Sequence, residues 1–239
     1  MKVFKVRTNK KPVAISLSVH SDKGAQVYVI GYDPVNPKTE YFTRFIEVKG
    51  TKNDEFNCPQ SPKSIKVIAW SKNRREFKLS DMQVRPLQER LNATGIDRHP
   101  DIRFIEVFSR RVGRLPARRT YTHPKASFKI QLLPVIYNDA GREHTTPARI
   151  HIKHPIIQVS KKHFDSMSIP QRVAILAHEY AHNFINADQD CEFEADANMT
   201  EIYDELGYGR LEAVYAFANI MSDTDMNYNR LSNISKNLY

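Results

Sequence analysis

Cysteine is scarce in this sequence of 239 residues: Cys58 and Cys191 are the only two, and they lie far apart. Two distant cysteines cannot build the disulfide framework of a small secreted scaffold, so we expect both to be free thiols. No apolar run approaches the ~18 residues that a membrane-spanning helix needs. The amino terminus also lacks the pattern of a signal peptide. We therefore expect a protein that makes no membrane contact and is not secreted by a signal peptide.

Charge is plentiful but unevenly divided. Apolar residues make up 41% of the sequence and charged residues 26%, which excludes a disordered or fibrous chain. Of the net charge of +9, residues 1–162 carry 32 Lys and Arg against 14 Asp and Glu, whereas residues 163–239 carry 4 against 13. This division predicts separate surfaces with separate partners. The basic part suits either nucleic acid, bound without sequence preference, or acidic neighbouring subunits.

Five arginines crowd the stretch 110–119 around a glycine and a proline. They could contact phosphates, pair with a partner's carboxylates, or form a solvated loop. No aromatic side chains are interleaved among them, so this stretch does not predict sequence-specific base stacking. The five are Arg110, Arg111, Arg114, Arg118 and Arg119.

The first 85 residues predict an all-β domain. Alternating apolar positions and β-branched residues indicate six short strands, separated by turn-rich stretches at 33–39 and 57–63. Strands at this spacing favour a small sandwich or barrel. The predicted strands are 3–6, 14–19, 26–30, 41–48, 64–70 and 76–84. Pro86 then opens a linker and a short helix at 87–93, so we place a domain boundary between residues 85 and 86.

Residues 86–239 predict a mixed domain that becomes helical after Ser168. Strands are expected at 104–108, 127–136 and 149–160, the last as an edge strand or with a bulge because Pro155 cannot donate to a ladder. Ser168 and Gln171 form a capping-box pattern, and Pro170 suits a first turn. These signals predict a helix over 169–185. Further helices are expected at 192–206, ended by Gly207, at 210–222 and at 226–237.

The sharpest motif is His178-Glu179-Tyr180-Ala181-His182, an HExxH pattern in the middle of the predicted helix 169–185. Residues four apart share one helical face, so both imidazoles can reach one zinc ion. Glu179 sits beside that face, where it can hold the water and act as general base. The pattern predicts a catalytic Zn²⁺ site.

Catalytic zinc usually has three protein ligands, so a third is required. Ten residues after His182, Glu192 and Asp196 lie one turn apart on the next predicted helix, whose cap is expected near Asp190. Glu192 is the expected ligand, with Asp196 bonded to the far nitrogen of a ligand histidine, His178 in the first instance. Glu194 is expected to point to solvent. Asp188, Asp190 and Cys191 stay open as alternatives for the third ligand.

HEYAH followed by EFEAD resembles the gluzincin metallopeptidases, whose pattern is HExxH and then ExxxD on the following helix. The stretch 157–177 also resembles the strand-then-helix approach to that motif in minimal members of the group. The resemblance implies a zinc metallopeptidase domain with a mixed sheet, in which a strand within 149–160 lines the cleft. The gap of ten residues is shorter than in the best-known members, which predicts a tight turn at 186–190.

A second resemblance concerns context. The run 194–217 is similar to short metallopeptidase-like proteins of tailed phages, including crAss-like phages. It implies a place in a phage particle near the portal or tail, or in the host cytoplasm. The partners would then be a peptide or protein substrate and other virion proteins, the latter contacted through the basic N-terminal half.

A peptidase also needs a donor for the oxyanion that develops opposite the water. Several tyrosines and arginines downstream of the motif could serve, and the sequence does not choose among them. The candidates are Tyr208, Arg210, Tyr215, Tyr228 and Arg230.

Together these patterns predict an α+β protein: an N-terminal β sandwich or barrel (1–85) for docking, then a minimal gluzincin-like domain (86–239). The expected function is hydrolysis of peptide bonds by a zinc-dependent metallopeptidase. The alternative is a structural virion protein, a head–tail connector or tail ring component, that retains the metallopeptidase fold.

Overall fold

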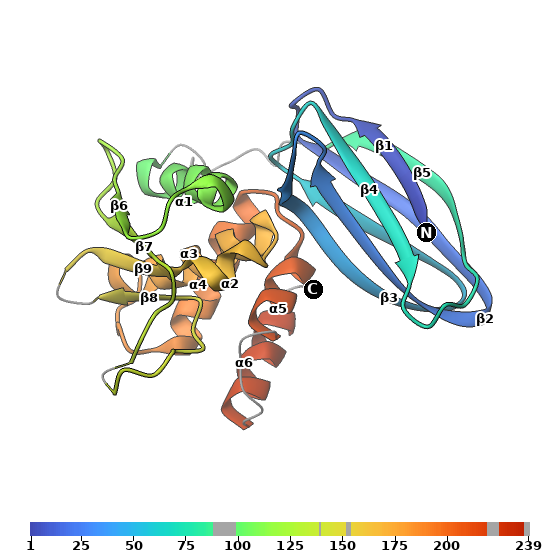
Figure 1. The fold of residues 1–239 in the computed structure, drawn as a ribbon. Helices are drawn as coiled ribbons and strands as arrows, with labels where there is room; N and C mark the ends of the chain where they lie inside the picture. The colour runs from blue at the N-terminus through green and yellow to red at the C-terminus, as the bar shows by residue number, and fades with distance from the viewer. Residues whose placement is uncertain (88–98, 139, 152–153, 219–224, 237–239) are drawn as a thin grey trace. The chain divides into compact units, whose positions relative to one another are not determined.

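The computed structural model describes residues 1–239 except 88–98, 139, 152–153, 219–224 and 237–239. The chain is mixed α+β, as predicted, with two separate sheets (Figure 1). It divides into two compact units, Met1–Arg90 with Gly207–Gly209, and Leu91–Leu206 with Arg210–Tyr239. The division falls near the predicted boundary after residue 85. The predicted helix at 87–93 lies almost wholly outside the described residues.

The N-terminal unit is an antiparallel sheet built around one long hairpin. The strands are β1 (Lys2–Arg7), β2 (Val13–Asp33), β3 (Asn36–Cys58), β4 (Ser64–Ser71) and β5 (Lys78–Pro86). β2 pairs with β3 along most of its length, with β5 over its first part and with β4 over its last part, and β1 adds to the far side of β4. Side chains on one face, such as Ile15, Val27 and Phe56, form the core.

The prediction of six short strands was wrong in number and length. Segments 14–19 and 26–30 belong to the single strand β2, and β3 extends well beyond 41–48 at both ends. The pairing of the two long strands is interrupted by a register shift between Ser21 and Ala25, where Gly24 and Gly50, the partner of Ser21, have positive φ angles of 76° and 82°. Pairing resumes at Ala25 and Val48 beyond the shift, so the two predicted segments of β2 are parts of one strand.

The C-terminal unit has a four-stranded sheet in the order β6-β7-β9-β8. The strands are β6 (Arg119–Tyr121), β7 (Lys129–Leu133), β8 (Ala148–His151) and β9 (Ile156–Ser160). The prediction of one strand over 149–160 was wrong: β8 and β9 form an antiparallel pair, and Pro155 precedes β9. β8 ends the sheet, so its outer edge is free of strand partners within the described residues.

The described part of this unit also contains helices. They are α1 (Pro100–Arg111), the short 3-10 turn η2 (Val112–Arg114), α2 (Lys161–Asp165), α3 (Ile169–Phe184), α4 (Glu192–Glu205), α5 (Arg210–Ala218) and α6 (Asp225–Lys236). The predicted strand at 104–108 was wrong, because this segment lies within α1. Its buried side chains Ile105 and Phe108 follow Ile102 at helical spacing. The short helix α2 was not predicted.

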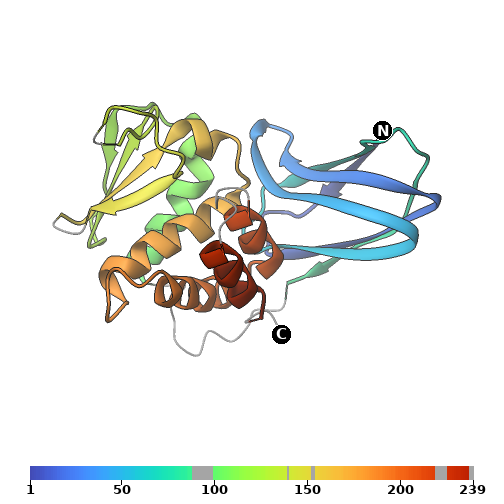
Figure 2. The same ribbon diagram turned by 90° about the horizontal axis from the view of Figure 1, so that it is seen from below.

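Helix α3 is the central element of the C-terminal unit. Figure 2 shows it between the sheet on one side and α4 to α6 on the other. Its side chains are almost all buried, including Val173, Leu176 and Ala177. Among the described residues, no helix combines the length and the apolar character needed to cross a membrane.

Candidate metal centre

The start of α3 fixes the register of the HExxH motif. The Ser168 backbone N–H donates to Gln171 Oε1 at 2.9 Å, which is the reciprocal half of the predicted capping box, and Pro170 lies in the first turn. His178 and His182 follow one turn apart near the end of the helix, and both side chains are buried. The local sequence therefore presents both imidazoles on one face of α3.

The two imidazoles turn the same nitrogen toward one point. Their Nε2 atoms lie 3.1 Å apart. His182 Nδ1 lies 2.7 Å from the backbone carbonyl oxygen of Gln189, so it must carry the proton and donate it. His178 Nδ1 lies 3.0 Å from Asp196 Oδ1. Both Nε2 atoms therefore point into the same space, where one cation could contact both.

Glu192 completes the group, as the helical spacing predicted. It is the first residue of α4, and its carboxylate oxygens lie 3.3 Å from His178 Nε2 and 3.5 Å from His182 Nε2. Tetrahedral zinc with bonds of about 2.0–2.1 Å requires ligand atoms about 3.3 Å apart. The three separations bracket that value, so these side chains fit a zinc ion.

The alternatives for the third ligand do not join this group. Asp188, Asp190 and Cys191 belong to the described residues, and the cluster of metal-ligating side chains consists of His178, His182 and Glu192. The cap of α4 is Cys191, whereas Asp190 lies just before it and donates its backbone N–H to Asp188 Oδ1. A helix cap near Asp190 was thus predicted to within one residue.

Asp196 occupies the buried position one turn after Glu192 and accepts an ion pair from α6. Arg230 Nε and an Nη atom lie 2.8 and 2.9 Å from its two oxygens, and another Nη atom lies 2.7 Å from Glu192 Oε2. The Arg230 guanidinium therefore pairs with both Glu192, the expected ligand, and Asp196, the carboxylate next to His178 Nδ1. The expectation that Arg230 donates to the oxyanion stays a prediction.

Glu179 lies next to the three-residue group and faces the sheet edge. Its Oε2 accepts the backbone N–H of Ile150 on β8 at 2.7 Å. Removal from water raises the pKa of this carboxyl group to about 7, although His178 and the Ile150 N–H work against the increase. A carboxyl group with this pKa can both take up and release a proton near neutral pH.

The pKa shifts of His178, Glu192 and His182 follow from burial and close pairing. Burial lowers the pKa of His178, but hydrogen bonds with Asp196 and Glu192 outweigh it and raise the pKa to about 9. The same bond to His178 lowers the pKa of Glu192 to about 2. Burial, with His178 beside it, lowers the pKa of His182. The group thus combines an anionic carboxylate with one neutral and one protonated imidazole, and a divalent cation would replace that proton.

A pocket of about 240 Å³ opens beside these residues. His178, Glu179, Glu192 and Arg230 border it, together with side chains from the approach to β8, from α3, α5 and α6. These further residues are Thr145, Thr146, Pro147, Ile175, Phe217 and Asn227. The ring of Phe217 packs edge-on against His178, with the centroids 5.3 Å apart. The pocket can admit a small group next to Glu179.

Three of the other predicted oxyanion donors do not border this pocket as far as the structure describes it. Tyr208 and Tyr215 are absent from its described lining, and so is Tyr228, which is 60% exposed. Arg210 is the first residue of α5, and its side chain lies outside the part of the structure described. Among the candidates, Arg230 alone borders the described pocket.

Glu194 differs from its prediction as a solvated side chain. Its two carboxylate oxygens accept the backbone N–H groups of Ala187 and Asp188 at 2.8 and 3.1 Å. It therefore fastens the short connection between α3 and α4, which the sequence predicted to be tight. The roles of Ile150 and Gln189 were also missed, because both act through backbone atoms, for which a side-chain motif gives no signal.

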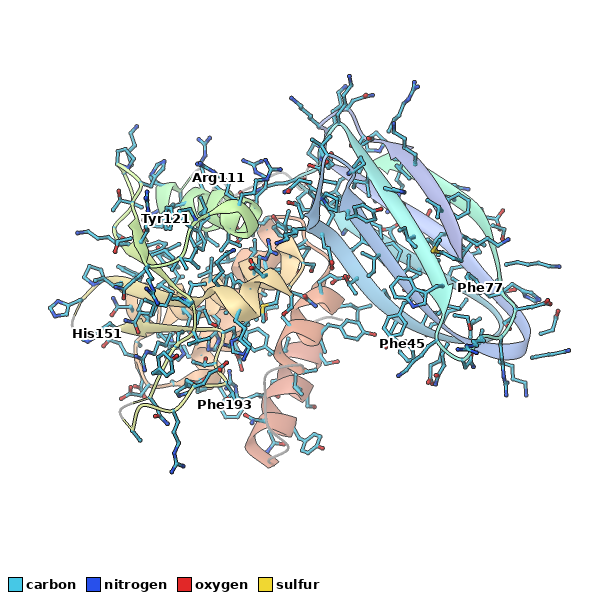
Figure 3. All side chains as sticks on the ribbon, viewed as in Figure 1. Phe45, Phe77, Arg111, Tyr121, His151 and Phe193 are labelled. Atoms are coloured by element: carbon cyan, nitrogen blue, oxygen red, sulfur yellow. The ribbon has the colours of Figure 1, made fainter. Side chains whose placement is uncertain are left out.

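Figure 3 shows the described side chains of both units, with Arg111, Tyr121, His151 and Phe193 labelled in the C-terminal unit. Comparison of the chain with protein-family models, with curated proteins and with solved structures gives no match. The chemistry of this site therefore has to be inferred from its own residues.

Proposed function

We propose that the protein is a zinc-dependent metallopeptidase. The observation that supports this most directly is the convergence of His178, His182 and Glu192 at ligand-atom separations of 3.1 to 3.5 Å, with Glu179 beside His178 and Glu192 in the lining of the adjoining pocket. A purely structural zinc site has no need of a free carboxylate beside it, since such sites use four protein ligands. Three ligands and an adjacent base are the arrangement of a hydrolase.

Each of the chain's own residues has a defined part in the proposed reaction. Bound zinc would supply a Lewis acid and would lower the pKa of water to about 7. Glu179 accepts a proton from the attacking water and delivers it to the leaving amine nitrogen as the peptide C–N bond breaks. Asp196 and the Gln189 carbonyl orient His178 and His182, so that both Nε2 atoms stay available.

Electrostatic balance supports zinc rather than a harder cation. Two imidazole nitrogens and one carboxylate are ligands typical of catalytic zinc, whereas magnesium and calcium prefer all-oxygen sites. The site carboxylates Glu192 and Asp196 are partly neutralised by Arg230. The remaining negative charge of these two carboxylates suits one divalent ion rather than a cluster of several ions.

The proposal is tested with zinc-loaded wild-type protein and the variant Glu179→Gln, each incubated with a peptide library derived from a proteome. New peptide termini are read by mass spectrometry. We expect wild type to cleave and Glu179→Gln to retain zinc but lose cleavage by at least about 100-fold, because the general base is gone. Glu201→Gln is the matched control, since Glu201 lies exposed on α4, and it should cleave like wild type.

Two results would contradict the proposal. If Glu179→Gln lost zinc together with activity, Glu179 would be a ligand rather than the base. If zinc-loaded wild type cleaved no more than Glu179→Gln, the site would not be hydrolytic under these conditions, and the alternative of a structural protein with a retained metal site would gain weight.

A further inference from the structure

The N-terminal unit carries a row of aromatic rings on the face of its sheet opposite the core. Tyr28 on β2 is the direct cross-strand partner of Phe45 on β3 and of Trp70 on β4. The Tyr28 ring lies 4.9 Å from Phe45 and 5.3 Å from Trp70, measured between centroids. All three side chains are half-buried. Large aromatic groups that the core does not use thus run across three adjacent strands.

Alternation along the strands shows that this row is not part of the core. The neighbours Val27, Val29 and Ala69 are fully buried and point to the opposite face of the sheet. Lys72 adds a cation at one end of the row, with Nζ 5.9 Å from the Phe45 ring centroid. The row therefore offers aromatic surface with positive charge beside it.

Trp70 also borders a large basic groove at the end of the same unit. The groove has a volume of about 1040 Å³, and five Lys or Arg side chains line it against the two acids Asp22 and Glu76. The five are Lys2, Lys23, Arg74, Arg75 and Lys78. Phe77 is a second aromatic residue in the lining, and Figure 3 shows Phe45 and Phe77 toward the same end of the unit.

Most of these cations are available for a ligand. Lys2, Lys23, Arg74 and Lys78 are exposed, and they form no ion pair with any residue that the structure describes. Arg75 instead braces the groove by donating to the backbone carbonyls of Lys23 and Gly24. Asp22 is already paired with His20 Nε2 at 2.9 Å. The free charge in the groove is therefore strongly positive.

We propose that this groove and the adjoining aromatic row bind a single-stranded polynucleotide without sequence preference. Proteins that do so combine a positive groove, which follows the phosphates, with aromatic rings on which unpaired bases stack. A duplex offers no free base faces to such rings. An acidic protein would satisfy the cations but would leave the row from Phe45 to Trp70 without a counterpart. This site is independent of the proposed peptidase and lies in the other unit.

The chain contains a built-in reporter for this proposal, because Trp70 is its only tryptophan. The full-length protein is titrated with an oligothymidylate of about 12 nucleotides, within the range that one binding site covers, while tryptophan fluorescence is recorded. Anisotropy of the same oligonucleotide, carrying a fluorescent label, gives the affinity. We expect quenching of Trp70 with a dissociation constant near the micromolar range at physiological salt, weakening steeply as salt increases.

Charge variants locate the site. Arg74→Gln with Lys78→Gln should weaken binding by at least about tenfold and reduce the slope of log affinity against log salt by about 1.4, since each phosphate contact on a single strand contributes about 0.7. Lys10→Gln with Lys63→Gln removes the same charge from exposed positions of the same unit outside the groove. This control pair should bind within about twofold of wild type.

Separate arms test stacking and the kind of polynucleotide. Trp70→Leu should weaken binding by about tenfold at unchanged salt slope, because it removes a base-stacking contact and no charge. Oligouridylate in place of oligothymidylate distinguishes RNA from DNA as the preferred strand. Three results would overturn the proposal. They are binding of inorganic polyphosphate that quenches Trp70 as strongly as the oligonucleotide does, a loss of affinity in the control pair as large as in Arg74→Gln with Lys78→Gln, and no binding of the oligonucleotide at all.

Discussion

Glu192 and Glu194 stand two residues apart at the start of α4, yet their carboxylates have different partners. Glu192 faces the two imidazoles and Arg230, whereas Glu194 accepts two backbone N–H groups of the preceding turn. The half-turn between them points the two side chains in different directions. Of these two glutamates, Glu192 therefore belongs to the candidate metal centre, whereas Glu194 stabilises the turn before α4.

This difference gives a paired prediction. Glu192→Gln should reduce zinc affinity by about 100-fold or more, because it replaces an anionic ligand with a neutral amide. Glu194→Gln should leave zinc affinity within about threefold of wild type and lower the free energy of unfolding by about 1 kcal/mol, since a Gln oxygen replaces one of two accepting oxygens. Chelator competition measures the first quantity and denaturant unfolding the second. Equal loss of zinc in both variants would show that the ligand is misassigned.

At the scale of elements, the site depends on the way that α6 docks against α4. Arg230 is the link: its guanidinium pairs with Asp196, whose side chain is almost fully buried, and with Glu192. A buried carboxylate in this position is stable only when a cation or hydrogen-bond donors compensate for lost hydration. The metal centre therefore needs a helix that begins more than thirty residues after Glu192.

Removal of this link should affect both stability and metal binding. We expect Arg230→Met to lower the free energy of unfolding of the C-terminal unit by about 3 kcal/mol, because the buried Asp196 side chain loses its cationic partner. Zinc affinity should fall by about tenfold, as Glu192 and His178 lose their positioning contacts. Ser232→Ala, at an exposed position of the same helix, is the control. Denaturant unfolding and zinc titration measure the two effects, and unchanged stability in Arg230→Met would contradict this account of the pairing.

For the whole molecule, the division into two units predicts separate responses to zinc. The proposed zinc ligands His178, His182 and Glu192 all lie in the C-terminal unit, and Trp70 lies in the N-terminal unit. A ligand that binds only a folded unit stabilises that unit by about 2.7 kcal/mol at 100 times its dissociation constant. We expect zinc to raise one thermal transition in calorimetry and to leave the transition followed by Trp70 fluorescence unchanged.

Chelator provides the reverse experiment. Removal of zinc should lower the calorimetric transition of the C-terminal unit, and His182→Ala should show the lower value with or without zinc, since it lacks a ligand. An equal shift of the Trp70 transition would mean that the two units unfold together. The predicted place in a phage particle, the virion partners and the peptide substrate stay predictions at this scale.

The local periodicity of the sequence determined much of the candidate site. HExxH on a capped helix places His178 and His182 on one face by geometry alone, and the spacing from Glu192 to Asp196 does the same on the next helix. The α+β class also followed from the change of pattern along the chain. These features depend on residues a few positions apart, so one sequence contains all the information that they require.

Tertiary structure decided what depends on distant partners. The segment 104–108 is short and apolar, which fits a strand or a buried helix equally well, and packing in the C-terminal unit makes it part of α1. The long β2–β3 hairpin continues on both sides of the register shift between Ser21 and Ala25, where the sequence pattern predicts separate short strands. Arg230, Ile150 and the Gln189 carbonyl reach the site only when α6, β8 and the turn before α4 pack around α3. Helical spacing in the sequence predicts the candidate ligands, but only the packed fold brings their supporting contacts together.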